Sequence, residues 1–314
     1  MREHRNVLVT GAAGFVGRAL VKALQANELF RVTALARHSH DDLGFAVCPV
    51  GEMDGATSYT QALAGIEVVI HTAARAHVMS DSAADPLAEY RRANVEATVN
   101  LARQAAAAGV KRFIFISSIK VNGESTPPGQ PFTARDVSHP EDFYAVSKLE
   151  AEQALLELSA NSGMQVVIIR PPLVYGPGVK GNFASMARIV AKGLPLPLGA
   201  VDNRRSLVSL GNLLSLVIRC IDHPAAAGRV FLVSDGEDLS TAELLKRLAN
   251  SGGFKSRLIP LPVGLLQAAA RLLGKGEVAQ RLLSSLQVDI SETCRLLEWQ
   301  PVCTVDEGLA KVYE

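Results

Sequence analysis

A tyrosine and a lysine four residues apart, Tyr144 and Lys148, form the pair in this sequence best suited to proton transfer. A free tyrosine has a pKa of about 10, which is too high for a base at neutral pH. A lysine one helical turn along the same face favours the phenolate. Ser118, at the end of a predicted strand, could hydrogen-bond the same substrate oxygen and polarise it. Asn94, in a predicted helix, could fix a backbone carbonyl or a water in a relay to Lys148.

A glycine-rich segment near the N-terminus, TGAAGFVG, could seat a dinucleotide. It follows a predicted strand and opens a predicted helix, as a dinucleotide fingerprint requires. Gly11 permits a tight turn, Gly14 lets backbone approach a pyrophosphate and Gly17 lets the helix pack close to the sheet. The N–H groups at the start of the helix, around Phe15 and Val16, would meet the phosphates. The spacing is GxxGxxG rather than GxGxxG. The turn therefore indicates a dinucleotide site mainly because Tyr144 and Lys148 are also present.

The end of the second predicted strand bears on the choice of cofactor. A cofactor with a free ribose hydroxyl usually meets an acid there, but this chain has Arg37 and no acid. The planar fork of Arg37 could pair with a 2′-phosphate, which favours NADP(H). A solvated arginine at a strand end is the alternative, and it leaves NAD(H) possible. Glu52 and Met53, after the third strand, could flank the adenine, with Glu52 accepting its amino group.

Short β-branched runs alternate with helical patterns through the first half of the chain. The predicted buried strands are Val7–Thr10, Val32–Ala36, Val68–His71, Phe113–Ser117 and Val166–Arg170, and the predicted helices are Phe15–Ala26, Leu87–Ala108 and Tyr144–Ser159. This alternation predicts an α/β fold with a doubly wound parallel sheet of the Rossmann type. We place a dinucleotide-binding domain at residues 1–175, with a returning strand near 230–235. A smaller, mainly helical substrate lobe follows at residues 176–314.

Composition narrows the class of partner. The 314 residues are 48% hydrophobic, enough for a large core with a second lobe, and the formal net charge of +1 gives no reason to expect nucleic acid. Four scattered cysteines predict no metal site and no disulfide framework, and they fit reduced thiols in the cytoplasm. No apolar run predicts an integral membrane segment. The apolar stretch Pro262–Leu273 reads as a helix packed on the protein, with a membrane-surface helix as the lesser alternative.

In chain order, these features resemble the extended short-chain dehydrogenases/reductases, in particular their nucleotide-sugar epimerase, dehydratase and reductase branch. The resemblance covers nearly the whole length. VIHTAA at residues 69–74 resembles the fourth-strand motif of that branch, and RPPLVYGPG at 170–178 resembles the segment beneath the nicotinamide. The resemblance implies catalytic roles for Ser118, Tyr144 and Lys148 with support from Asn94, and cofactor contacts at Ala73, Ala74, Tyr144, Lys148 and Pro171.

In that family the second lobe binds a nucleoside diphosphate sugar, so the resemblance implies a UDP-sugar as substrate. The segment with Asn182 and Phe183 resembles the one that touches the diphosphate and base. RRSLV at residues 204–208 is similar to the short strand whose arginine binds the diphosphate, which places Arg205 there. A second family arginine has no clean match, and Ser284 or Ser285 could take its place.

One departure narrows the prediction. Many epimerases of this branch carry a tyrosine where this chain has Asn122, and that segment, with Arg75 and His77, resembles a subgroup linked to bacterial surface-polysaccharide synthesis. Its members resemble C4-keto reductases of UDP-2-acetamido-2,6-dideoxy-hexos-4-uloses. Arg75 and His77 could line the sugar pocket or face solvent. We therefore expect NADPH-dependent C4-keto reduction. The alternative is a UDP-hexose 4-epimerase acting on UDP-glucose or UDP-N-acetylglucosamine with bound NAD. A homodimer is expected by analogy.

Overall fold

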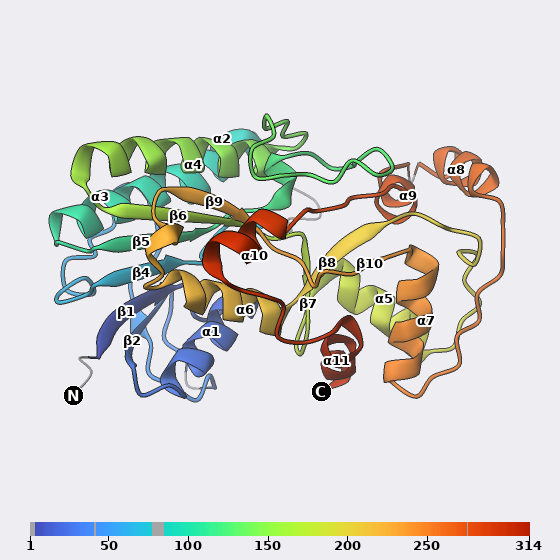
Figure 1. The fold of residues 1–314 in the computed structure, drawn as a ribbon, viewed down its shortest axis with the longest axis horizontal. Coiled ribbons are helices and arrows are strands. Elements are labelled where there is room, and N and C mark those ends of the chain that lie inside the picture. The colour runs from blue at the N-terminus through green and yellow to red at the C-terminus, as the bar shows by residue number, and fades with distance from the viewer. Residues whose placement is uncertain (1–3, 41, 77–84, 275) are drawn as a thin grey trace.

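A large parallel sheet organises the first part of the computed structural model, which describes residues 4–40, 42–76, 85–274 and 276–314. Its strands are β1 (Arg5–Thr10), β2 (Phe30–Ala36), β3 (Cys48–Pro49), β4 (Val68–His71), β5 (Arg112–Ile116), β6 (Gln165–Arg170) and β9 (Arg229–Leu232). Their order is β3-β2-β1-β4-β5-β6-β9, and each pairing is parallel (Figure 1). The predicted α/β fold with a parallel sheet is confirmed.

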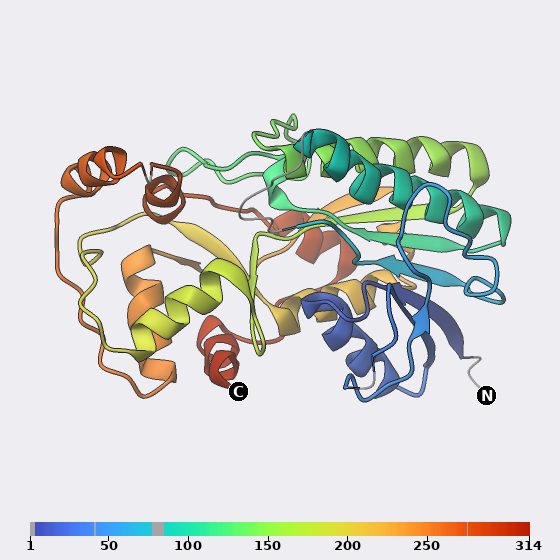
Figure 2. The same cartoon turned by 180° about the vertical axis from the view of Figure 1, so that it is seen from behind.

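Helices cover both faces of this sheet (Figures 1 and 2). They are α1 (Phe15–Gln25), α2 (Pro86–Arg91), α3 (Ala97–Ala107), α4 (Phe143–Ser162), α6 (Leu210–Cys220) and α10 (Ser291–Leu297), with the short segments η1 (Arg92–Glu96), η2 (Ile119–Val121) and η3 (Pro224–Ala226). The prediction of one continuous helix over residues 87–108 is wrong in one respect. The structure has α2 and α3 there, with the π-helical turn η1 between them.

The two faces of the sheet pack into two separate apolar clusters. Val7 and Val9 of β1 face the cluster that contains α1 and α6, and Leu8 between them faces the cluster that contains α3 and α4. The same alternation places Phe113 of β5 toward α3 and α4 and Ile114 toward α1 and α6. Successive strand residues point to opposite faces. Because both faces are covered, the strands read as continuous apolar runs.

A smaller lobe lies at the carboxyl side of the large sheet. It contains β7 (Leu173–Tyr175), β8 (Arg205–Ser209), β10 (Asp238–Leu239), α5 (Gly181–Ala191), α7 (Thr241–Ser251), α8 (Val263–Leu272), α9 (Gly276–Leu283), α11 (Val305–Ala310) and η4 (Lys311–Tyr313). The strands form a small sheet of order β10-β8-β7. Tyr175, Phe183 and Leu245 belong to its separate apolar core. The predicted helical second lobe is confirmed, with this small sheet in addition.

The long loop after β5 joins the two lobes. The Thr126 N–H donates to the Ser285 carbonyl at 2.9 Å, and the Phe132 N–H donates to the Gln287 carbonyl at 2.8 Å. This loop begins at Ser118 and ends at the start of α4. The segment that precedes Tyr144 is therefore fixed on both lobes at once.

A buried ion pair fastens α4 to the ends of β5 and β6. Arg170 is 5% exposed and Glu152 is 2% exposed. The Arg170 Nη2 donates to Glu152 Oε2 at 2.5 Å, and Nε donates to both carboxylate oxygens, at 3.0 and 3.2 Å. The Ser117 hydroxyl donates to the same carboxylate. Arg170 Nη1 also donates to the Asn122 amide oxygen at 2.9 Å. Each charged group in this network therefore has partners.

Removing one partner of this pair should destabilise the fold strongly. Glu152→Gln leaves the Arg170 guanidinium buried without a counter-charge, so the free energy of unfolding should fall by about 3–5 kcal/mol. The matched control is Glu67→Gln, because Glu67 pairs at 3.0 Å with Lys111, whose side chain is 71% exposed. That loss should stay below about 1 kcal/mol. Urea denaturation measures both, and similar losses would contradict the special role of the Glu152 carboxylate.

Candidate active site

The glycine turn follows β1 and leads into α1, at the point beside β4 where the strand order of the large sheet reverses. Open α/β sheets bind ligands in the crevice at this point. Gly11 has a φ of +67°, and a Cβ on it would lie 2.7 Å from the Ala73 nitrogen. A Cβ on Gly17 would lie 2.2 Å from the Gly11 carbonyl oxygen. Packing therefore excludes a side chain at both positions. Ala73 and Ala74, which follow β4, lie in the loop beside this turn.

The start of α1 is open to an anionic ligand. Gly14 is the N-cap and makes no side-chain cap, and a Cβ on it would lie 3.1 Å from the Gly11 carbonyl oxygen. The first N–H groups of the helix, from Phe15 and Val16 to Gly17, have no acceptor within the helix. These N–H groups and the positive end of the helix suit a pyrophosphate. The residues of the turn thus fit a dinucleotide.

Arg37 lies at the end of β2 and is paired in the structure. Its guanidinium lies 3.8 Å from the Glu52 carboxylate, and both side chains are largely exposed. Met53, next along the chain, is half-buried against the core cluster beneath α3 and α4. The Glu52 carboxylate therefore competes with any phosphate for Arg37. The preference for NADP(H) stays a prediction.

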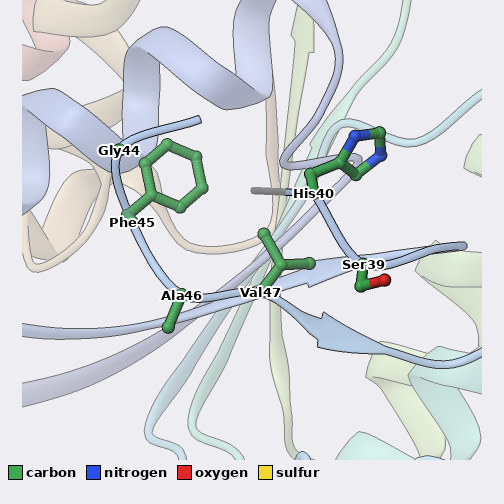
Figure 3. A pocket seen from close by; sticks show the side chains of 6 residues that line it. All are labelled: Ser39, His40, Gly44, Phe45, Ala46 and Val47. Atoms are coloured by element: carbon green, nitrogen blue, oxygen red, sulfur yellow. The ribbon is translucent and has the colours of Figure 1, made fainter. Parts of the chain in front are cut away.

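An open pocket of about 450 Å³ lies in the loop that follows β2. It is lined by Ser39, His40, Gly44, Phe45, Ala46 and Val47 (Figure 3). Arg18 of α1 donates to the Asp42 carbonyl at 3.3 Å, which ties this loop to the first helix. β1 and β4 separate β2 from β5 in the sheet, so roughly 14 Å of sheet lies between the pocket and the strand before Ser118. The lining of the pocket includes neither Ser118 nor the residues of α4.

Helix α4 carries Tyr144, Lys148 and Glu152 at intervals of four residues, hence on one face. Lys148 is 2% exposed, and its Nζ lies 4.0 Å from the centre of the Phe115 ring. Burial lowers the pKa of Lys148 to about 7, and the negative charge of Glu152 opposes this decrease. The lysine is therefore poised to exchange its charge near neutral pH.

The Tyr144 ring packs edge-on against Tyr90, with 6.3 Å between the ring centres. The Arg75 guanidinium lies 5.5 Å from the centre of the Tyr90 ring. Burial, together with the charge of Asp142, raises the pKa of Tyr144. Within the described part of the chain, no hydrogen bond joins Tyr144 to Lys148. In the protein without ligands, burial raises the pKa of Tyr144, and this outweighs the expected stabilisation of the phenolate by Lys148.

Asn94 occupies the π-helical turn η1 and is 1% exposed. Its Nδ2 donates to the Arg75 carbonyl at 3.1 Å and to the Ser147 hydroxyl at 2.9 Å, and its Oδ1 accepts the Arg75 N–H at 2.7 Å. The Ser147 hydroxyl donates to the Tyr144 carbonyl at 2.8 Å. Asn94 thus joins the loop after β4 to α4, between Tyr144 and Lys148. A π-helical turn at such a position is common at functional sites.

Ser118 follows β5 and caps η2, where its Oγ accepts the Lys120 N–H at 3.3 Å. The Ile119 N–H donates to the carbonyl of buried Pro171, which follows β6, at 2.9 Å. The Lys120 ammonium lies 2.5 Å from the carboxylate of Asp142, two residues before Tyr144. These contacts fix Ser118 against both Pro171 and the start of α4.

Arg205 lies at the start of β8, and its Nη1 donates to the Ser284 carbonyl at 2.9 Å. Burial lowers the pKa of Arg205, and the charge of Glu124, in the loop after Ser118, opposes this. Arg205 therefore lies near the loop that follows Ser118. Ser284 meets it through a backbone carbonyl rather than its hydroxyl.

Other predicted substrate contacts are placed differently. The Phe183 ring is 1% exposed and stacks on Tyr175 at 5.4 Å, so it serves the core of the second lobe. The prediction of a substrate contact through this ring is not supported, because packing uses the ring. Asn182 is exposed in the first turn of α5. His77 lies outside the described residues.

A chain of buried polar groups beneath the site escaped sequence analysis. Burial lowers the pKa of His71 to about 3, so this ring is neutral. Its Nδ1 lies 2.6 Å from the Thr10 hydroxyl and its Nε2 lies 2.9 Å from the Thr98 hydroxyl, which donates to the Asn94 carbonyl at 2.8 Å. The chain connects the residue before Gly11 with the turn that holds Asn94. A histidine within an apolar strand was the available signal.

Comparison with known proteins identifies the family. A family model described as the NAD dependent epimerase/dehydratase family matches residues 7–234. A UDP-glucose 4-epimerase from Vibrio cholerae is 50% identical over 305 residues, which cover 97% of this chain and 93% of that protein. The structure of UDP-glucuronic acid 4-epimerase from Bacillus cereus with NAD has a TM-score of 0.77, 20% identity and coverage of 98% and 97%. The structure of RMD from Pseudomonas aeruginosa with NADPH has a TM-score of 0.74 and 25% identity, and the match covers 98% of this chain and 98% of that one.

These findings correct the predicted function. C4-keto reduction is wrong as the main prediction. The relative that is 50% identical over nearly the whole chain is a UDP-glucose 4-epimerase and not a reductase. The structure supplies a physical reason. Asn122, the departure that suggested a reductase, is 2% exposed, accepts from Arg170 and donates to the Thr133 carbonyl at 3.0 Å. These hydrogen bonds occupy the side chain, so the departure at this position gives no reason to expect a reductase. This chain belongs to the NAD dependent epimerase/dehydratase family, as a nicotinamide-dinucleotide enzyme of the extended short-chain dehydrogenase/reductase type.

Proposed function

We propose that this protein is a UDP-hexose 4-epimerase that interconverts UDP-glucose and UDP-galactose or their 2-acetamido counterparts. The observation that carries the proposal is the 50% identity to a UDP-glucose 4-epimerase over nearly the whole chain. The geometry supports it in a specific way. Tyr144 and Lys148 share one face of α4, and Ser118 follows the strand beside it.

Epimerisation at C4 needs a proton acceptor that can return the proton. An oxidised nicotinamide dinucleotide, held at Gly11, Gly14 and the start of α1, would supply the acceptor and donor of the C4 hydride. Tyr144 removes the proton of the C4 hydroxyl, and Ser118 donates a hydrogen bond to the same oxygen as it becomes a carbonyl. After the keto sugar turns, Tyr144 returns the proton to that oxygen. Each group ends in its initial state, so no external reductant is consumed.

Lys148 adjusts the charge near Tyr144. Its pKa of about 7 means that a small change in surroundings decides whether it carries a charge. A charged Lys148 stabilises the phenolate when Tyr144 holds no proton. Glu152, four residues further along α4, favours that charged form. Asn94 acts through the backbone, because it holds Arg75 and Ser147 on either side of the site.

The nucleotide diphosphate is assigned to the second lobe. Arg205, at the start of β8, and Asn182, at the start of α5, offer this lobe a cation and an exposed polar group. We propose that Arg205 pairs with the diphosphate, because a guanidinium fork suits phosphate oxygens. The residues near Arg75 are proposed to face the sugar.

Replacing Tyr144 by Phe should separate catalysis from cofactor binding. Interconversion of UDP-glucose and UDP-galactose without added cofactor should fall by about 10²–10⁴-fold, because the proton acceptor is lost. The bound dinucleotide should stay at the unaltered protein's level. Tyr313→Phe is the matched control, since that tyrosine lies in the C-terminal segment η4. Ion-exchange chromatography of the two UDP-sugars measures turnover. Retained turnover in Tyr144→Phe would reject the mechanism.

The choice between the two dinucleotides depends on Arg37 and Glu52. Arg37→Ala should weaken NADPH about tenfold more than NADH, because only NADPH carries the 2′-phosphate. Glu52→Gln should have the opposite effect, since it frees the guanidinium that Glu52 now holds at 3.8 Å. Fluorescence titration of the protein freed of bound dinucleotide measures the affinities for NADPH and NADH. Equal effects on the two dinucleotides would remove Arg37 as a determinant.

The buried Lys148 predicts a pH dependence of stability in the stripped protein. Its pKa is about 7 when folded, against 10.5 as the ordinary value. Between these values the unfolded chain binds more protons, so the free energy of unfolding rises with pH above about 7. Lys148→Met should raise that free energy at neutral pH and flatten the rise. Urea denaturation from about pH 7 to 8.5 measures it. Lys111→Met, at an exposed lysine, is the control, and an unchanged slope in Lys148→Met would contradict the assignment.

A further inference from the structure

The far end of the second lobe concentrates exposed apolar side chains. Fourteen large hydrophobic side chains are exposed in the described residues, and six of them lie within residues 259–278. They are Ile259, Leu261, Leu265, Leu272, Leu273 and Val278, with exposures of 47%, 37%, 62%, 88%, 72% and 50%. Such a concentration of exposed apolar side chains within one segment is typical of an interaction site.

Helix α8 holds the centre of this surface. None of its ten residues is buried. Leu265, Ala268, Ala269 and Leu272 are all exposed, and their spacing of three and four residues places them on one face. Figures 1 and 2 place α8 and its neighbour α9 at the end of the molecule opposite the N-terminus. Helix α8 therefore lies away from the large sheet and from the site on α4.

An overlapping segment, which ends just before Glu277, is basic. Residues 252–276 contain Lys255, Arg257, Arg271 and Lys275 and no acidic residue. This local charge of +4 lies in a chain whose formal net charge is only +1. Lys255, Arg257 and Arg271 are exposed, and none forms an ion pair with another described residue. Figure 1 shows the chain between α7 and α8 running along the same end of the molecule as α8. We call this end, with the exposed leucines of α8 and these three cations, the α8 surface.

The charge decides which partner fits. Two copies of this chain meeting face to face through the α8 surface would bring the same cations together, because a twofold contact pairs like with like. An anionic lipid bilayer instead satisfies both properties. Leucines enter the boundary between headgroups and acyl chains while lysines and arginines stay at the phosphates. In the described residues no helix combines the length and apolar character needed to cross a bilayer, so α8 would lie on the surface.

We propose that the α8 surface docks this protein on an anionic lipid bilayer. Leu265, Leu272 and Leu273 enter the interface, and Lys255, Arg257 and Arg271 contact lipid phosphates. Each basic residue near such a surface contributes to binding, and the attraction weakens with ionic strength. Docking leaves the crevice on the large sheet open to nucleotide sugars. This inference is independent of the reaction proposed above.

Vesicle flotation with the full-length protein tests the proposal. The protein should float with phosphatidylcholine vesicles that contain about 30% phosphatidylglycerol, and not with phosphatidylcholine alone, and salt at about 0.5 M should release it. The double variant Leu272→Gln, Leu273→Gln should reduce the floating fraction at least about fivefold, because less apolar area enters the interface. Val302→Gln is the matched control, since Val302 is 66% exposed elsewhere on the molecule. It should float like the unaltered protein.

Thermal melting of each variant shows whether it is folded. A folded double variant that floats as well as the unaltered protein would overturn the proposal. Equal flotation with neutral and anionic vesicles would overturn it as well, because the cations would then play no part. If light scattering instead shows an oligomer that the double variant dissociates, with no flotation, the α8 surface binds a second copy and the lipid proposal is rejected.

Discussion

The buried Glu152 carboxylate is the interaction on which the rest of the site depends. It accepts from Ser117, the residue before Ser118, and from Arg170, the residue before Pro171. It also lies four residues from Lys148 on the same face of α4 and favours the charged form of that lysine. One carboxylate thus holds together the ends of β5 and β6 and the helix that carries Tyr144. A charge buried at this depth is tolerated only because each oxygen has donors.

Much of the fold was predictable because its signals are local. The strand runs of β1, β4, β5 and β6 are apolar on both faces, which follows from a sheet covered on both sides. Gly11 and Gly17 were predictable because the turn requires glycine at both positions, where an added Cβ would lie 2.7 and 2.2 Å from backbone atoms. The break at Asn94 was not, since a π-helical turn depends on partners at Arg75 and Ser147 that are distant in sequence.

Local sequence patterns also failed to predict the electrostatic properties of this protein. A net charge of +1 describes the chain as a whole, but it averages a strongly basic segment at one end with acidic residues elsewhere. Lys148 is a second case. Sequence spacing places it beside Tyr144, yet its pKa depends on burial against Phe115, which no local pattern reveals. Electrostatic behaviour is set by three-dimensional surroundings, so spacing predicts which groups meet and burial decides their charge.

Asn122 illustrates how a local departure can mislead about chemistry. A change of residue type close to the catalytic serine invites a functional interpretation, because neighbouring positions in sequence are assumed to share the site. The backbone after Ser118 turns in η2, and the Asn122 side chain points into the protein, where its oxygen accepts from Arg170 and its nitrogen donates to Thr133. Arg170 is already committed to Glu152 through its other nitrogens. An amide at position 122 therefore completes the partners of a buried guanidinium. These contacts account for an asparagine at position 122 without reference to the reaction, so the residue is compatible with an epimerase.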